Sequence, residues 1–157
     1  GMGRIGTAVA RKASYGFGMK VLGYRRNLPG DICADYGILT SDLDKVIRNS
    51  DFLSIHLPYT KDTFHLVSRE KLELMKPDAY LLNLGRGEVV DQAALRELLL
   101  SNRLAGAALD VFEGEIPDAD DPLLHMDQVI ATPHIAGLSK QAMERLSYQA
   151  ALGLQRC

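Results

Sequence analysis

The chain has 157 residues, of which 46% are hydrophobic and 24% charged, and its formal net charge is −2. This composition excludes a disordered chain, because so apolar a sequence buries enough surface to offset the entropy lost on folding. The charge balance gives no basic field for nucleic acid, and the short apolar runs exclude a membrane span. Cys33 and Cys157 are the only cysteines, so we expect a reducing, cytoplasmic setting without disulfides.

Short β-rich runs alternate with helix-period segments along the chain. The predicted strands are Lys20–Tyr24, Phe52–His56, Tyr80–Leu84, Ala107–Val111 and Val129–Ala131. The predicted helices are Thr7–Tyr15, Leu43–Arg48, Arg69–Met75, Gln92–Ser101 and an amphipathic segment at Ser139–Cys157. This alternation predicts βαβ units and an α/β fold with a doubly wound parallel sheet that helices cover on both sides.

Local signals predict where two of these helices begin. Ser41 and Asp44 form a pair that resembles a capping box, so Ser41 is the predicted N-cap of the second helix. Asp91 precedes the segment Gln92–Ser101 and is the predicted N-cap there.

The chain opens on Gly1-Met2-Gly3-Arg4-Ile5-Gly6, a G-x-G-x-x-G sequence followed by a helical pattern. In a dinucleotide-binding Rossmann fold, Gly1 would permit a tight turn, Gly3 would let a pyrophosphate approach the backbone, and Gly6 would let helix and strand pack closely. That turn normally follows a strand. We therefore expect residues 1–157 to be a Rossmann-type dinucleotide-binding domain that lacks its first strand, a fragment of a longer protein. The alternative is an ordinary glycine-rich loop.

Two arginines follow the predicted strand Lys20–Tyr24. At the end of the second strand the dinucleotide fingerprint expects a carboxylate for the ribose 2′-hydroxyl, but this chain has Arg25 and Arg26. A carboxylate repels a 2′-phosphate, whereas a guanidinium binds it through charge-assisted hydrogen bonds. The pair favours NADP over NAD; the alternative is two solvated arginines on a loop.

Three further polar side chains follow predicted strands. Arg86 lies just after the strand Tyr80–Leu84, Glu115 after the next strand, and His134 after Val129–Ala131. Carboxyl ends of parallel strands share one edge of the sheet, so we expect these side chains to meet there. An arginine suits a substrate carboxylate, and a carboxylate beside an imidazole is typical of a general acid–base pair. Glu113 is a second candidate for the carboxylate. We predict no metal site.

These motifs together resemble the nucleotide-binding domain of the D-isomer-specific 2-hydroxyacid dehydrogenases, which include glyoxylate/hydroxypyruvate reductases and D-3-phosphoglycerate dehydrogenases. The resemblance covers essentially all 157 residues. It rests on the glycine fingerprint, His56-Leu57-Pro58, Asn83-Leu84-Gly85-Arg86-Gly87, Asp110-Val111-Phe112 with Glu115, and Pro133-His134-Ile135-Ala136-Gly137, in the family's order and spacing.

The resemblance implies a role for each site residue. Arg86 would anchor the substrate carboxylate and keto oxygen, His134 would exchange a proton with the carbonyl oxygen, and Glu115 would hydrogen-bond His134 and stabilise its protonated form. The remaining cofactor residues would be Arg4 and Ile5 at the pyrophosphate, Leu57, Pro58 and Thr63 along the adenosine and ribose, Leu84 and Asp110 at the nicotinamide end, and Gly85 and Gly137 beside the same pocket.

The resemblance implies hydride transfer between NAD(P)H and a 2-keto or D-2-hydroxy acid, in a protein that forms a homodimer. The family's substrate domain flanks this one on both sides, so we expect the chain by itself to lack turnover. Two departures are visible: Arg25 stands where the family often has an acidic residue, and Ile116 separates Glu115 from Pro117. Alternative functions are a dinucleotide-sensing module of the corepressor type and a relative of formate or phosphonate dehydrogenases.

Overall fold

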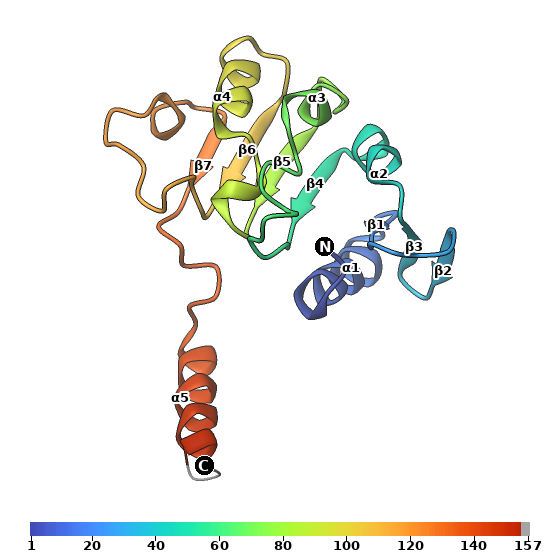
Figure 1. Ribbon diagram of the computed structural model, residues 1–157, viewed down its shortest axis with the longest axis vertical. Coiled ribbons are helices and arrows are strands. Elements are labelled where there is room, and N and C mark those ends of the chain that lie inside the picture. The colour runs from blue at the N-terminus through green and yellow to red at the C-terminus, as the bar shows by residue number, and fades with distance from the viewer. Residues whose placement is uncertain (155–157) are drawn as a thin grey trace.

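The computed structural model of the chain describes residues 1–154 (Figure 1). The helices are α1 (Arg4–Phe17), α2 (Leu43–Asn49), α3 (Arg69–Leu72), α4 (Gln92–Leu100) and α5 (Lys140–Leu154), with 3-10 turns at Gly87–Val89 and Pro122–Leu124. The strands are β1 (Leu22–Tyr24), β2 (Ile32–Ala34), β3 (Gly37–Thr40), β4 (Phe52–Ile55), β5 (Tyr80–Asn83), β6 (Gly106–Leu109) and β7 (Val129–Ala131). The prediction for the end of the last helix falls on residues 155–157, outside the described residues.

Four strands form the parallel sheet that carries the site, in the order β4-β5-β6-β7. A second, small sheet has the order β1-β3-β2, with β1 and β3 parallel and β2 antiparallel to β3. The predicted α/β class and its parallel sheet are confirmed. The strands β2 and β3 were not predicted, because they have no clear alternation and lie in a segment with the turn residues Pro29, Gly30 and Gly37.

The two sheets are not joined by a strand within residues 1–154. Between β1 and β4 lies a small hollow of about 40 Å³, with Tyr24 on one side and Leu53 and Ile55 on the other. The lining of this hollow is mostly apolar and also includes Leu43, Val46, Leu57, Leu66 and Val67. The gap agrees with the predicted Rossmann sheet in which the first strand is missing.

The main core lies between one face of the β4–β7 sheet and helices α2, α3 and α4. Side chains that point to this face are buried, among them Leu53, Leu81 and Leu109, and they contact Ile47 of α2 and Leu99 of α4 within one apolar cluster. The alternate residues of the strands face the other way and are more open.

The opposite face of the same sheet carries Phe52 and Tyr80, which are about half exposed and stack on each other with ring centroids 5.4 Å apart. Ile130 of β7 is 68% exposed. We predicted helices on both faces of the sheet. Within residues 1–154, helices pack on one face of the β4–β7 sheet. Helix α5 extends away from the sheet rather than packing on this face (Figure 1).

The predicted N-cap residue is confirmed for α4 and is wrong for α2. Asp91 caps α4, accepting a hydrogen bond from the Ala94 N–H at 2.9 Å. Helix α2 is capped by Asp42, which accepts from the Lys45 N–H at 2.9 Å, and not by Ser41. A carboxylate in extended backbone immediately before the helix reaches the third N–H more directly than the residue before it.

None of the helices in residues 1–154 is both long and apolar enough to cross a bilayer.

The fold gives a stability prediction at α4. Leu99 is fully buried, whereas its neighbour Leu100 is 60% exposed. We expect Leu99→Ala to lower the free energy of unfolding by about 2–5 kcal/mol, because it removes apolar contacts and leaves a cavity. Leu100→Ala is the matched control and should change it by less than about 0.5 kcal/mol. Urea denaturation measures both, and equal losses at the two positions would contradict this description of the core.

Candidate active site

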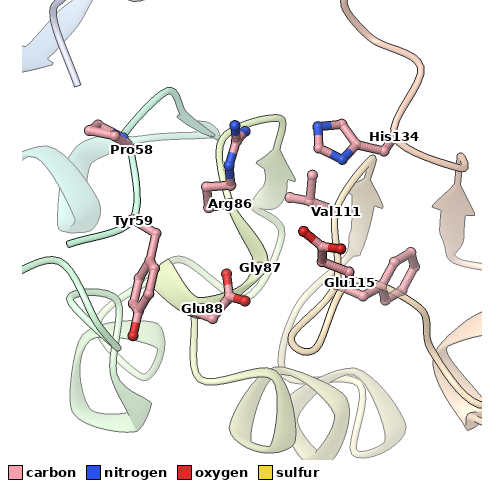
Figure 2. Close-up of a pocket in the computed structure, with 9 residues that line it drawn as sticks. Pro58, Tyr59, Arg86, Gly87, Glu88, Val111, Glu115 and His134 are labelled. Carbon is pink, nitrogen blue, oxygen red and sulfur yellow. The ribbon is translucent and has the colours of Figure 1, made fainter. Parts of the chain in front are cut away.

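A hollow of about 340 Å³ lies at the carboxyl edge of the β4–β7 sheet. Figure 2 shows Arg86, Glu115 and His134 around this hollow, each from the loop after a different strand. The complete lining is Pro58, Tyr59, Arg86, Gly87, Glu88, Val111, Phe112, Glu115 and His134. The structure therefore brings together the three predicted catalytic residues and Pro58.

Arg86 is held in place by the end of β5. The buried Asn83 side chain accepts a hydrogen bond from the Gly85 N–H at 3.1 Å and donates one to the Arg86 carbonyl at 3.0 Å. The Arg86 guanidinium donates to the Gly85 carbonyl at 2.7 Å and is otherwise free to face the cavity. Its exposed charge lies at a fixed backbone position, which is what binding a carboxylate requires.

His134 is positioned by Asp110, the first residue after β6. Both Asp110 carboxylate oxygens accept hydrogen bonds from the loop that carries the histidine: from the Thr132 hydroxyl at 2.5 Å, the Ile135 N–H at 2.8 Å and the Ala136 N–H at 2.9 Å. The His134 N–H donates to the Asp110 carbonyl at 2.9 Å. This network joins the ends of β6 and β7 and fixes the backbone of the imidazole.

The Asp110 carboxylate is 5% exposed. Burial by itself raises the pKa of Asp110, but the bonds from Thr132, Ala136 and Ile135 and the nearby charge of His134 lower the pKa below its ordinary value. The carboxylate is thus ionised and fully engaged with the protein. The contact of Asp110 with the nicotinamide end stays a prediction; in the structure its carboxylate accepts hydrogen bonds from the His134 loop.

Glu115 and His134 line the same cavity, but within the part of the chain that the structure describes no hydrogen bond joins them. Glu113, the alternative carboxylate, is occupied elsewhere: its side chain lies 3.0 Å from the His65 Nε2, and its N–H donates to the Gln92 side chain at 2.8 Å. Of the two acidic residues, only Glu115 is placed to reach His134 across the cavity.

Two of the three candidate catalytic residues have strained backbones. His134 has φ of 54° and Glu115 has φ of 67°, in the left-handed region that favours glycine. Such a conformation costs on the order of 1–3 kcal/mol for a residue with a side chain, and it persists only where the surroundings enforce it. For His134 the enforcing contacts are those of Asp110.

The glycine fingerprint suits the pyrophosphate of a dinucleotide. A Cβ on Gly6 would lie 2.1 Å from the Gly1 carbonyl, so only glycine allows this close turn, whereas a Cβ on Gly3 would meet nothing within 4 Å. Helix α1 has Gly3 at its N-cap, no side-chain cap and no acidic residue in its first turn. Its free N–H groups, with exposed Arg4 and Ile5 beside them, therefore face an open space in which an anion is stabilised.

The other predicted cofactor residues lie along the same edge of the molecule. Arg25 and Arg26 follow β1, and Leu57 follows β4 and touches Gly85, whose Cβ would lie 2.7 Å from the Leu57 carbonyl. Leu84 is exposed after β5. Gly137 follows the Asp110-bound loop, one residue beyond Ala136.

Thr63 is buried and organises the loop after β4. Its hydroxyl donates to the Pro58 carbonyl at 2.8 Å and accepts from the Thr60 N–H at 2.7 Å. Thr63 therefore fixes the shape of this loop, which we expect to lie along the adenosine and ribose. The Thr63 hydroxyl itself is bonded within the loop.

Five members of the cavity were not among the predicted site residues: Tyr59, Gly87, Glu88, Val111 and Phe112. A signal was available for each of them, because each lies within two residues of Pro58, Arg86 or Asp110, which were already singled out after strand ends. Glu88 lines the cavity from the 3-10 turn Gly87–Val89, directly after Arg86. Residues 1–154 contain no cluster of three or more His, Cys, Asp or Glu that could hold a metal ion.

Comparison with known proteins decides the family. The sequence profile of the NAD-binding domain of D-isomer-specific 2-hydroxyacid dehydrogenases matches residues 1–136. The chain belongs to that family. The resemblance stated from the motifs is therefore confirmed.

Individual relatives agree. The glyoxylate reductase of Korarchaeum cryptofilum (strain OPF8) is 44% identical over 154 residues, which are 98% of this chain and 46% of that protein. A D-lactate dehydrogenase from Aquifex aeolicus, solved with NAD and lactic acid, is 35% identical with a TM-score of 0.86, over 99% of this chain and 50% of that one. An acyclic imino acid reductase (Bsp5), solved with NADPH and D-Arg, is 33% identical with a TM-score of 0.85, over 96% and 47%. The chain spans about half the length of these relatives.

The Asp110 network gives a prediction for pH-dependent stability. We expect Asp110→Asn to lower the free energy of unfolding at pH 7 by about 1–3 kcal/mol, because an amide cannot accept all the bonds that the carboxylate accepts. The depressed pKa of Asp110 stabilises the fold above the unfolded-state pKa of about 3.9, and this contribution is lost as the pH falls through the lower folded-state value. The difference in the free energy of unfolding between the wild type and Asp110→Asn should therefore shrink below about pH 4.

Urea denaturation at pH 7 and at pH 3 measures this difference. Asp118→Asn, at an exposed position of the following loop, is the control and should have little effect at either pH. A wild-type advantage over Asp110→Asn that stays constant down to pH 3 would contradict the assignment.

Proposed function

We propose that this chain is the dinucleotide-binding domain of an oxidoreductase that transfers a hydride between NAD(P)H and a 2-keto or D-2-hydroxy acid. The observation that carries the proposal is the meeting of Arg86, Glu115 and His134 around one cavity at the carboxyl edge of the sheet. Chain segments far apart in sequence supply a carboxylate-binding cation, an acid–base group and a carboxylate within one space of about 340 Å³.

Each side chain has a distinct task in this proposal. Arg86 binds the carboxylate of the acid and orients the adjoining carbonyl oxygen, and such positioning contributes roughly 7–11 kcal/mol in favourable cases. His134 gives a proton to that oxygen during reduction and takes one during oxidation. Glu115 stabilises the protonated imidazole from across the cavity. A nicotinamide dinucleotide, when bound, supplies or accepts the hydride.

The chain's own residues would hold the dinucleotide at two places. The N-terminus of α1, with Gly3 and Arg4, binds the pyrophosphate. Arg25 and Arg26, after β1, give the adenosine end a positive charge that favours the 2′-phosphate of NADP. Support for both cofactors exists among the relatives, since the lactate dehydrogenase structure contains NAD and the imino acid reductase structure contains NADPH.

A cytoplasmic location and a homodimer remain part of the proposal. The first rests on the two cysteines, of which Cys33 is exposed and free. The second rests on the family resemblance. Catalysis further requires a substrate domain, so turnover is tested in a form of the protein that carries both domains.

The acid–base role gives a first kinetic prediction. His134→Ala should lower kcat for the reduction of a small 2-keto acid by about 10²–10⁴-fold, because no group then protonates the developing alkoxide. Steady-state assays of NAD(P)H oxidation measure it. His125→Ala is the matched control, since His125 is exposed and its ring bonds the Ala119 carbonyl at 2.8 Å outside the cavity. Equal activity of His134→Ala and the wild type would overturn the proposal.

The two acidic residues give a second kinetic prediction. Glu115→Gln should move the alkaline limb of the pH profile for reduction to lower pH, because a neutral amide no longer stabilises the imidazolium. Glu113→Gln should leave this profile in place, since Glu113 bonds His65 and not His134. A profile moved by Glu113→Gln but not by Glu115→Gln would show that the wrong carboxylate was assigned.

A further inference from the structure

An ion pair crosses the edge at which the adenosine end of the dinucleotide is proposed to bind. The Arg26 guanidinium lies 3.1 Å from the Asp62 carboxylate, although the two residues are 36 apart in sequence. Arg26 follows β1 and Asp62 follows β4, so the pair spans the gap between the two sheets. Arg25, the neighbouring cation, takes part in no ion pair among residues 1–154.

The two partners differ in side-chain length and in how their backbone is held. Asp62 lies on the turn of residues 60–64, which the buried Thr63 hydroxyl and the N–H bonds of Thr63 and Phe64 to the Thr60 carbonyl hold in place. Arg26 has a long side chain that is 51% exposed. The short Asp62 side chain therefore keeps its negative charge close to this turn, while the longer Arg26 side chain can turn towards another anion.

We propose that Asp62 determines the choice between NADPH and NADH by holding Arg26. This inference rests on the proposed function, because it concerns the cofactor of that same site. A 2′-phosphate carries nearly two negative charges, so it must draw Arg26 away from Asp62 and lie near the Asp62 carboxylate. The 2′-hydroxyl of NADH is uncharged, so its binding neither breaks the Arg26–Asp62 ion pair nor brings two negative charges together. Asp62 thus lowers the preference for NADPH that Arg25 and Arg26 create.

The test compares the affinities of Asp62→Asn and the wild type for the two cofactors. We expect the Kd for NADPH to fall about fivefold and the Kd for NADH to change by less than twofold. An exposed ion pair accounts for a factor of this order, and the gain should shrink in 0.5 M NaCl because salt screens exposed charges. Fluorescence titration of the bound reduced nicotinamide measures both constants.

The chain offers a matched control at the opposite edge of the sheet. Asp51 is 70% exposed and pairs with Lys76 at 2.6 Å, much as Asp62 is 72% exposed and pairs with Arg26. Asp51 directly precedes β4, far from the carboxyl edge. Asp51→Asn should leave both dissociation constants unchanged, which separates a local effect from a change in net charge.

A second variant shows whether Asp62 acts through Arg26. In an Arg26→Gln background, Asp62→Asn should improve NADPH binding by less than twofold. An NADPH-to-NADH ratio that Asp62→Asn leaves unchanged, or an equal gain with and without Arg26, would overturn the inference while leaving dinucleotide binding intact. A wild-type protein that binds neither cofactor would instead overturn the proposed function, and this inference with it.

Discussion

The parallel order of β4, β5, β6 and β7 is the constraint on which the site depends. Because each strand runs in the same direction, each strand end delivers its following loop to one edge of the sheet. Arg86, Glu115 and His134 therefore meet although they come from three separate loops. The buried face of the same strands packs on α2, α3 and α4, so the core that stabilises the sheet also fixes the spacing of the polar groups at its edge.

Much of this arrangement could be predicted from the sequence, because strand runs bounded by helix signals leave few possible topologies. The order of elements, the parallel sheet and the edge that carries Arg86 and His134 all follow from periodicity. The β2–β3 pair does not, since turn residues such as Pro29, Gly30 and Gly37 precede or begin these strands and indicate a loop.

Side-chain partnerships within the site could not be predicted, because they depend on distances between segments remote in sequence. The bond between His65 and Glu113 joins residues 48 apart, and no local pattern distinguishes Glu113 from Glu115. Asp110 is similar: its position at a strand end suggests a ligand contact, but its burial and its three bonds to the following loop exist only in the folded chain.

The Asp110 bonds also anchor the His134 loop separately from the helix α5 that follows it. Helix α5 extends from the body of the molecule, and only residues 137–139 connect it to the clamped Ala136 (Figure 1). These three residues, one of which is Gly137, form the joint between α5 and the loop that carries His134. Because the Asp110 bonds act on Thr132, Ile135 and Ala136, which precede this joint, they fix the backbone of His134 independently of the direction in which α5 extends.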